Sequence, residues 1–483
     1  MRKIYFLILA NTIFFSACSL LAPKLKTPDT SFSASNSCKE CDGNLSFDRQ
    51  WWKLFKSDEL NALVDEALKN STDLRLAFIN LERAGANLGI SRSNLLPKLD
   101  AQGSFNRAKS SENATNRPST LNNTYAMSLN LSYELDLWGK YKDDFLAKNK
   151  AYEASVYDFE TARLSLVSNV VKLYFNAINL NNQVQILSQS VKDYEKNYEL
   201  KSELFKVGAI SEYELASFKA QLDSARASLE STKLSKDSND KALAILTSNK
   251  LDDILYKTYD AKTLEDYDIN LPSGISSEIL LLRPDIAASL KSLEEKNYLV
   301  GAARAQFLPS ISLTGLLGFS STALNNLTEN PSNIWSVGGT ALMPIFRWGE
   351  IAYNVDLAKL SKDEAFLNYE STLKTALGEV RTALISTETA FKNEQNYKNL
   401  LQSQSKIYEL SQMRYDTGLI SLTDLITARN NFLNAKLSYE NAVYAKLSAI
   451  VDSIKAFGGG FKQDKNYNKN LKEDTQKLDL SFQ

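Results

Sequence analysis

The stretch Gly-Ile-Ser-Arg-Ser-Asn-Leu-Leu-Pro at residues 89–97 returns at residues 301–309 as Gly-Ala-Ala-Arg-Ala-Gln-Phe-Leu-Pro, with the glycine, arginine, leucine and proline in the same places. Two further pairs keep this order at nearly the same separation: Leu137-Trp138-Gly139 with Arg347-Trp348-Gly349, and residues 207–211 with residues 417–421. Chance is a poor explanation for three ordered matches. We therefore infer a two-fold internal repeat, with its halves at residues 57–271 and 272–460.

The two halves are expected to share one plan, which is a helix, two strands, a long helix, a turn and a returning helix. The first helix covers about residues 58–94 and its copy about residues 276–306, because a Leu-Pro pair follows each and proline cannot continue a helix. After each proline the apolar period changes from helical to two. This change places four strands at about residues 98–106, 125–137, 310–320 and 334–346.

The second predicted strand shows the alternation most clearly. Its odd-numbered residues are Tyr125, Met127, Leu129, Leu131, Tyr133, Leu135 and Leu137, and most residues between them are polar. A tilted strand of ~9–11 residues crosses a bilayer, so one face can meet lipid and the other a watery lumen. The alternative is a soluble sheet with one face on a core. Aromatic residues at the strand ends and the export signal described below favour the membrane.

Four strands cannot close a barrel by themselves, and open strand edges are not tolerated in lipid. We therefore expect the chain to form an oligomer. The segments between paired strands, about residues 107–124 and 321–333, are rich in Asn, Ser and Thr. These two segments are expected to be extracellular loops.

The long helices dominate the chain. Residues 140–207 contain neither glycine nor proline, which predicts a helix on the order of 100 Å long. Apolar residues recur in it every seven positions, which is typical of left-handed coiled-coil packing: Phe159, Leu166, Leu173, Leu180, Leu187 and Tyr194. A turn at Gly208 sends the chain back through about residues 212–247 as the partner helix. The second half has helices at about residues 350–415 and 421–456, a turn at Gly418, and the terminating Gly458-Gly459-Gly460.

Composition excludes several classes of protein. The 483-residue chain holds 56 Lys and Arg against 57 Asp and Glu, and it has no histidine. The balanced charge argues against nucleic-acid binding. Because the chain has no histidine, we exclude the hydrolases, zincins and metal enzymes that depend on this residue. We therefore expect a protein that is not an enzyme and that binds no cofactor and no metal.

The N-terminus is typical of an export signal. Arg2 and Lys3 precede an apolar run at residues 4–15, which is too short for a permanent membrane helix. The chain is therefore expected to be exported.

The end of this signal resembles the bacterial lipobox, because small residues stand directly before Cys18. We expect residues 1–17 to be removed as a signal peptide and Cys18 to be acylated, with residues 18–56 as a lipidated N-terminal segment. An ordinary cleaved signal is the alternative. Ser19, in place of the aspartate that retains many lipoproteins in the inner membrane, favours sorting to the outer membrane.

Two further cysteines, Cys38 and Cys41, are spaced as a CxxC pair. Such a pair can be a redox or metal site, but a zinc site needs further ligands and a redox motif usually opens a helix in an α/β fold. A small local disulfide in an oxidising periplasm is the simpler interpretation. The polar C-terminal tail, residues 461–483, is expected to be irregular.

Together these features resemble the outer-membrane factor family, the TolC and OprM type of trimeric exit duct, over nearly the whole chain. The resemblance is carried by the paired Gly-x-x-Arg-x-x-x-Leu-Pro motifs, the two helix turns, and these stretches: Trp51-Trp52, residues 133–139, Leu282-Arg283-Pro284-Asp285-Ile286, residues 344–349 and residues 456–460. It is closest to the CmeC-like lipoprotein branch that serves multidrug pumps. The resemblance implies a mixed α/β membrane protein, in which a trimeric twelve-stranded transmembrane barrel with four strands per protomer continues as a periplasmic coiled-coil tunnel.

The resemblance also implies a periplasmic gate just after the two turns. Glu214 and Asp424 lie six residues beyond their glycines, so a trimer would carry six carboxylates near one constriction. Such charges would attract cations and raise one another's pKa. Asp424 falls where the family has a gate aspartate, and Tyr415 matches a tyrosine that links neighbouring helices in the closed state. Thr427 and Ile420 stand where the family has a second aspartate and an arginine.

The turns themselves would meet a periplasmic adaptor. They comprise Val207, Gly208, Ala209, Gly418, Leu419 and Ser421. The resemblance implies a homotrimer in outer-membrane lipid that works with this adaptor (membrane fusion) protein and an inner-membrane resistance-nodulation-division pump, as a passive exit duct for drugs and other toxic compounds. A type I protein-secretion exit channel of the same fold is the alternative. The alternating strands argue against a pore-free coiled-coil scaffold, and no catalytic constellation favours an exported enzyme.

Overall fold

The computed structural model describes residues 21–25, 49–115, 118–248, 250, 252 and 283–460. The predicted signal peptide, Cys18, Cys38, Cys41 and the tail at residues 461–483 lie outside the described residues. The chain divides into two compact units. The first, here called the sheet unit, holds residues 1–29, 81–155 and 288–370, and the second, the helical unit, holds residues 30–80, 156–287 and 371–483.

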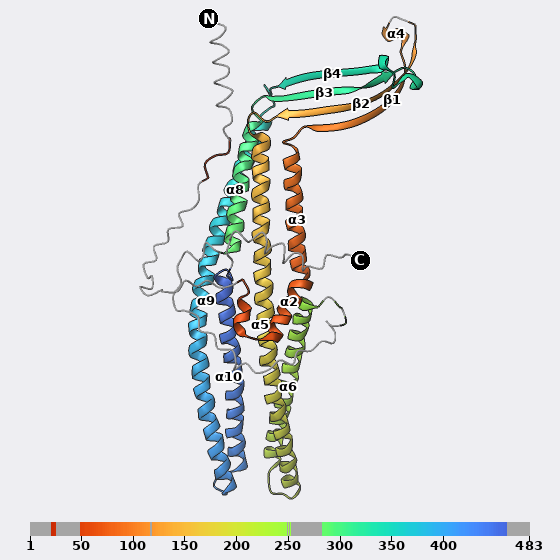
Figure 1. Ribbon diagram of the computed structural model, residues 1–483. Helices are drawn as coiled ribbons and strands as arrows, with labels where there is room; N and C mark the ends of the chain where they lie inside the picture. Colours follow the sequence, from red (N-terminus) through yellow and green to blue (C-terminus); the bar gives the residue numbers. More distant parts are fainter. Residues whose placement is uncertain are drawn as a thin grey trace. The chain divides into compact units, whose positions relative to one another are not determined.

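The sheet unit contains four antiparallel strands in the order β1-β2-β3-β4 (Figure 1). They are β1 Lys98–Lys109, β2 Leu121–Leu135, β3 Ser310–Ser321 and β4 Asn333–Leu342. A short helix, α4 Glu112–Thr115, lies between β1 and β2, and two 3-10 turns, η4 Leu324–Asn326 and η5 Asn330–Ser332, lie between β3 and β4. Neighbours in sequence are therefore neighbours in the sheet.

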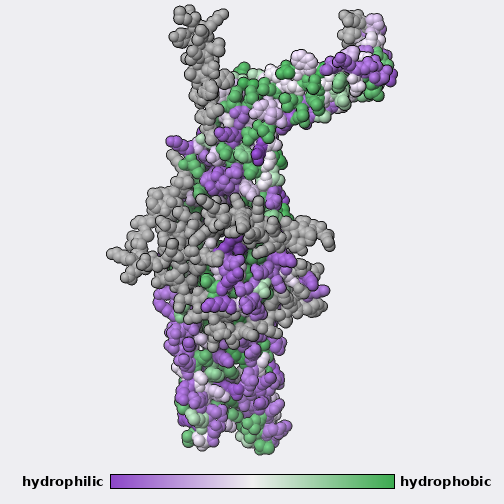
Figure 2. Space-filling model, viewed as in Figure 1, coloured by the Kyte–Doolittle hydropathy of each residue, from purple (hydrophilic) through white to green (hydrophobic). Residues whose placement is uncertain are grey.

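The strand register places the apolar residues of all four strands on one face. Leu129 lies opposite both Ala101 and Leu317, and Leu317 lies opposite Trp335. Directly opposed residues point to the same side of a sheet. This apolar face is open in the protomer, since the side chain of Trp335 is 75% exposed, and Figure 2 shows hydrophobic residues along the strands. Such a face needs lipid or protein to cover it.

Three strands differ from the prediction. β1 continues to Lys109 instead of ending at about residue 106, and β2 runs from Leu121 to Leu135 instead of from about residue 125 to 137. β4 ends at Leu342 instead of continuing to about residue 346. Pro344 explains the earlier end of β4, because proline has no N–H to donate to a strand ladder. The chain then turns sharply through Trp348 and Gly349, which have φ angles of 49° and 84°.

Most of the described helices are long. They are α2 Asp58–Asn70, α3 Thr72–Ser93, α5 Lys140–Lys206, α6 Glu212–Thr247, α8 Pro284–Ala305, α9 Glu350–Asp416 and α10 Leu422–Ala456, with a 3-10 helix, η1, at Trp51–Phe55. At ~1.5 Å per residue, the 67 residues of α5 and of α9 each extend on the order of 100 Å. Among the described helices, none combines the length and the apolar composition needed to cross a bilayer.

The prediction of one helix over about residues 58–94 was wrong, because Ser71 divides it into α2 and α3. Ser71 has an extended ψ of 123°, and its backbone N–H donates to Ala67 to end α2. Its side-chain oxygen then accepts the N–H of Leu74 at 3.4 Å, which begins α3. A serine can stop one helix and cap the next because its hydroxyl competes for backbone groups. In the second half, α8 begins at Pro284, and residues 276–282 lie outside the described residues.

The last part of the heptad pattern of α5 packs against α6, as the sequence predicted. Val191 of α5 forms a buried cluster with Leu222 and Leu229 of α6, and Leu187 and Tyr194 pack against it. Leu187 and Tyr194 belong to the seven-residue series. The two helices therefore form one coiled-coil hairpin.

Aromatic side chains build the core beside this hairpin. Trp51 and Trp52 are each only 1% exposed, and their rings meet edge to face at 6.3 Å. Phe55 packs on Phe175 of α5, with 4.9 Å between ring centroids. The Trp-Trp pair of the sequence thus anchors η1 in the helical unit.

The Leu-Arg-Pro-Asp motif also has a structural role in the helical unit. The guanidinium of Arg283 binds Asp285 at 2.7 Å and Glu379 of α9 at 2.6 Å. It also donates to the carbonyl of Ala456, at the end of α10, at 3.2 Å. One buried cation therefore joins the start of α8 to α9 and satisfies a terminal carbonyl of α10.

Candidate functional site: the two helix turns

The turn between α5 and α6 is a glycine-dependent helix end. The N–H of Ala209 donates to the carbonyl of Leu204 at 2.8 Å, and the N–H of Gly208 donates to Phe205 at 2.9 Å. This pair of hydrogen bonds is the Schellman motif, which needs a left-handed residue after the helix. Gly208 supplies it with a φ of 69°.

The turn between α9 and α10 repeats this geometry. The N–H of Leu419 donates to Arg414 at 2.8 Å, and the N–H of Gly418 donates to Tyr415 at 2.9 Å. Gly418 has a φ of 76°. Tyr415 therefore contributes its carbonyl to the turn, and its half-buried side chain has no hydrogen bond to another described residue.

Both predicted gate carboxylates complete a capping box. The hydroxyl of Ser211 accepts the N–H of Glu214 at 3.2 Å, and the carboxylate of Glu214 accepts the N–H of Ser211 at 3.2 Å. Ser421 and Asp424 make the same two bonds, at 3.2 and 3.1 Å. Each carboxylate thus helps to start its helix, whatever further role it has.

Asp424 also accepts the hydroxyl of Ser421 at 2.7 Å. The hydroxyl and backbone N–H of Ser421 hold the pKa of Asp424 below its ordinary value, and the charge of Arg414 acts in the same direction. Asp424 is exposed and is therefore ionised at neutral pH. Within the described protomer no hydrogen bond or ion pair joins Asp424 to Glu214.

The turns expose apolar side chains. Val207 is 77% exposed, Leu419 is 70% exposed, and the neighbouring Tyr213 is 83% exposed. Ala209 is also exposed, whereas Ser421 uses its hydroxyl in the cap of α10. Exposed apolar groups at the end of a long hairpin are suited to contact with another protein.

A polar link that the sequence did not predict joins the two hairpins further along the helices. Arg429 of α10 forms an ion pair with Asp193 of α5. The guanidinium of Arg429 also lies 5.8 Å from the ring of Tyr408, which stacks on Phe432 at 5.6 Å. Sequence periodicity carries no signal for this pair, because its members belong to different hairpins of the chain.

The comparisons with known proteins agree with this geometry. A family model described as "Outer membrane efflux protein" matches residues 63–249 and 275–459. The outer membrane protein OprJ of Pseudomonas aeruginosa is 32% identical over 472 residues, which is 95% of this chain and 96% of OprJ. The probable outer membrane lipoprotein SilC of Salmonella typhimurium is 28% identical over 474 residues, which is 95% of this chain and all of SilC.

Among solved structures, the CmeC outer membrane channel of Campylobacter jejuni is 46% identical and superposes with a TM-score of 0.90. The match covers 96% of this chain and 100% of that one. A one-sided apolar sheet combined with long helical hairpins is thus the architecture of an outer-membrane channel subunit.

The chain belongs to the outer membrane efflux protein family. It is an outer-membrane efflux channel with a periplasmic tunnel, as the sequence predicted, and its family is one of channels and not of enzymes.

Proposed function

We propose that this efflux channel works as a homotrimer, in which three four-stranded sheets close a twelve-stranded transmembrane barrel. The observation that carries the proposal is the sheet itself. Its four strands share one apolar face, while β1 and β4 each leave one edge unpaired within the described protomer. In lipid each unpaired backbone group costs several kcal/mol, so these edges must pair with other copies.

The two-fold repeat explains how one chain lines the tunnel with equivalent hairpins. α5 and α9 are both 67 residues long. Each ends at a glycine with positive φ, followed by a serine and a capping-box carboxylate. We assign the two copies to residues 57–271 and 272–460.

The carboxylates after the turns are proposed to form the periplasmic gate. In a trimer, Asp424 and Glu214 would form two rings of three acidic groups at the end of the tunnel. The exposed, ionised carboxylate of Asp424 supports this role, because a ring of negative charge attracts cations and repels anions. Tyr415, beside the same turn, is proposed to contact the neighbouring hairpin in the closed state.

The apolar turns are proposed as the docking point for a periplasmic adaptor protein, which connects the duct to an inner-membrane resistance-nodulation-division pump. Gly208 and Gly418 shape the turns, and Val207, Ala209 and Leu419 provide exposed apolar contacts. The duct would then be the passive exit for drugs and other toxic compounds that the pump selects.

The N-terminal assignments complete the proposal. Residues 1–17 are a signal peptide, Cys18 is lipidated, Cys38 and Cys41 form a local disulfide, and residues 461–483 are a polar tail. The name of the relative SilC, a probable outer membrane lipoprotein, supports the lipid anchor.

The gate is tested by ion selectivity in planar bilayers with the Asp424→Asn variant. Asparagine keeps an oxygen that can accept the N–H of Ser421 but removes the charge, whereas the control Ser421→Ala weakens the cap and keeps the charge. We expect the cation-to-anion permeability ratio to fall several-fold in Asp424→Asn and to stay near wild type in Ser421→Ala. An unchanged ratio in Asp424→Asn would exclude the acidic gate.

A further inference from the structure

A short segment without regular secondary structure contacts α8 in the sheet unit. This segment, residues 21–25, is here called the strap, and α8 holds it through its main chain. Arg304 donates to the carbonyl of Leu21 at 3.2 Å, and Asn297 donates to the carbonyl of Pro23 at 2.7 Å. Because both bonds go to carbonyl oxygens, α8 binds the backbone of the strap.

Gly301 is the position on α8 that admits the strap. A Cβ built on Gly301 would lie 2.6 Å from the backbone nitrogen of Ala22 and 2.9 Å from its Cα, and it would also clash with the carboxylate of Asp143. These are distances that real Cβ atoms do not reach, and the obstacles include backbone. Gly89, in the same place of the first Gly-x-x-Arg motif, has nothing within 4 Å of a built Cβ. A side chain at Gly301 would therefore collide with the strap and Asp143, whereas a side chain at Gly89 would meet open space.

Asp143, in the first turn of α5, also lies beside Gly301. Its side chain is fully buried, and no described side chain donates a hydrogen bond to either carboxylate oxygen. Burial raises the pKa of Asp143 to about 6, and the charge of Asp136 adds to the rise. The backbone N–H of Leu21 and the charge of Lys142 oppose it. The strap thus contacts α5 through Leu21 as well as α8.

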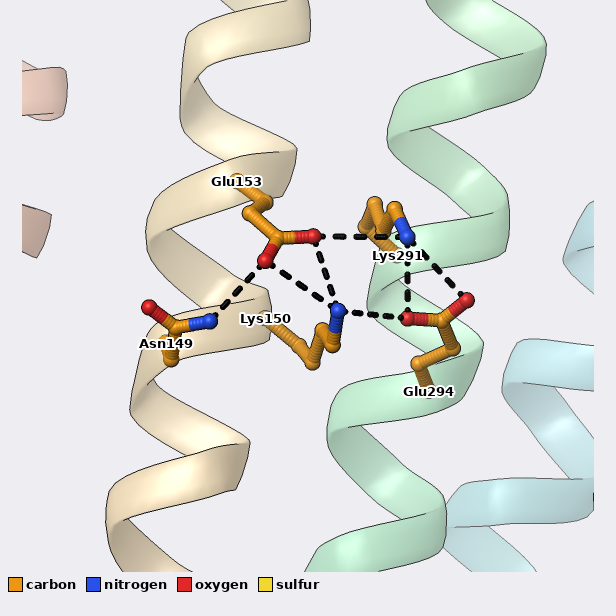
Figure 3. A network of polar contacts seen from close by, with 5 residues as sticks. All are labelled: Asn149, Lys150, Glu153, Lys291 and Glu294. Carbon is orange, nitrogen blue, oxygen red and sulfur yellow. Dashed lines mark hydrogen bonds and ion pairs between the residues drawn. The ribbon is translucent and has the colours of Figure 1, made fainter.

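The same two helices are joined by side chains a little further from the sheet. Lys150 of α5 binds Glu153 at 2.9 Å and Glu294 of α8 at 3.2 Å, and Lys291 of α8 binds Glu153 at 3.3 Å and Glu294 at 3.1 Å (Figure 3). Lys150 and Glu294 lie seven residues, about two turns, from Asp143 and Gly301 respectively. The ion-pair cluster and the strap therefore both lie along the seam where α5 meets α8. Side chains join the two helices at the ion-pair cluster, whereas the strap lies between them nearer the sheet.

We propose that the strap is a staple that binds the seam of α5 and α8 through Asp143, Asn297, Gly301 and Arg304, and that it fixes the level at which the lipidated N-terminus meets the membrane. The direction of the strap supports this role. Leu21 contacts Arg304, in the last turn of α8, whereas Pro23 contacts Asn297, further from β3. The chain thus approaches the sheet toward its N-terminal end.

The height of the anchor follows from chain length and rests on the proposed lipidation and barrel. Leu21 lies three residues after Cys18, a distance of at most ~11 Å along an extended chain. β3 begins at Ser310, only six residues after Arg304. The acyl chains of Cys18 would therefore enter the membrane beside the periplasmic rim of the barrel.

Docking of the strap is tested with a nitroxide label on the full-length protein in detergent. The label is placed at exposed Lys24 through Lys24→Cys, in a background of Cys38→Ser and Cys41→Ser. We expect Gly301→Ala to shorten the rotational correlation time of the label at least three-fold, and the matched Gly89→Ala to leave it unchanged. Equal mobility in wild type and Gly301→Ala, at equal helical content, would overturn the staple.

Two milder variants keep the test decisive if Gly301→Ala does not fold. Asn297→Ala and Arg304→Gln each remove or weaken one donor to the strap without adding bulk, and Arg92→Gln is the matched control in the first motif. We expect higher label mobility in the first two alone, and no change in either would overturn the staple.

A second measurement separates the staple from the proposed membrane assembly. In phosphatidylethanolamine and phosphatidylglycerol vesicles, we expect relaxation by oxygen and by a water-soluble nickel chelate to place a label at Leu21, introduced by Leu21→Cys in the same background, nearer to the bilayer than the label at Lys24. A label that is immobile but far from the bilayer would keep the staple and overturn the anchor level. The presence or absence of ion conductance in the same samples reports on the duct independently.

Discussion

Replacing Asp143 with asparagine should stabilise the protein above neutral pH. The Asp143 side chain is fully buried, and its pKa is raised from 3.8 to about 6. A raised pKa means that the folded state favours the neutral acid. The resulting contribution to stability is complete below about pH 4 and is lost as the pH rises through about 6. At 1.36 kcal/mol per pH unit, this rise corresponds to about 3 kcal/mol between acidic and neutral pH.

Asparagine has nearly the same shape as aspartate but carries no charge to bury. With an unfolding entropy of ~2.1 cal/mol/K per residue, about 3 kcal/mol corresponds to a Tm difference on the order of 3 °C for a chain of this length. Thermal unfolding followed by circular dichroism, in detergent at several values between pH 4 and pH 8, measures it. We expect Asp143→Asn to melt about 3 °C above wild type at pH 8, with the difference shrinking toward pH 4.

The control is the adjacent Asp144→Asn. The carboxylate of Asp144 accepts the hydroxyl of Ser91 at 2.6 Å, so its replacement weakens a hydrogen bond and should stabilise the protein at no pH. The reasoning is refuted if Asp143→Asn melts no higher than wild type at pH 8, or if its advantage is the same at pH 4.

Three further variants test the helix turns and the link between hairpins. Gly418→Ala should lower stability by about 1 kcal/mol, because alanine is strained at a φ of 76°, whereas Gly378→Ala within α9 should be neutral or stabilising; thermal melts compare them. Val207→Ser combined with Leu419→Ser should weaken adaptor binding at least ten-fold in a surface-binding assay, while Leu234→Ser, which changes an equally exposed leucine on α6, should not. Arg429→Gln should increase channel open probability by breaking the ion pair with Asp193, whereas Arg226→Gln, whose partner Glu195 lies within the same hairpin, should leave it unchanged.

The long elements were predictable because their signals are local. Uninterrupted residues 140–207 with a glycine directly after them specify a helix and its end, and the Leu-Pro pairs specify where strands begin. The capping boxes are equally local, because each carboxylate follows its serine by three residues. The sequence prediction assigned Glu214 and Asp424 to a gate because of their charge and did not use this spacing. Ser71 was missed because serine is tolerated inside helices as well as at their ends.

The parts that could not be predicted depend on distant residues. Asp193 meets Arg429, and Arg283 meets Glu379 and Ala456, only after the hairpins have packed. The burial of Asp143 is likewise invisible in the sequence, where it looks like an ordinary acidic residue in a first helical turn. The Gly-x-x-Arg repeat identified Gly301, but only the contacts with the strap and with Asp143 explain why a glycine is needed there.

The measurement that tests the central claim most directly is single-channel recording of the purified full-length protein in a planar bilayer, on a preparation shown by native mass spectrometry to be a folded trimer. A trimeric efflux duct with an acidic constriction predicts small, discrete, cation-selective openings. A folded trimer that passes no current, at any voltage and with any of the gate variants, would contradict it.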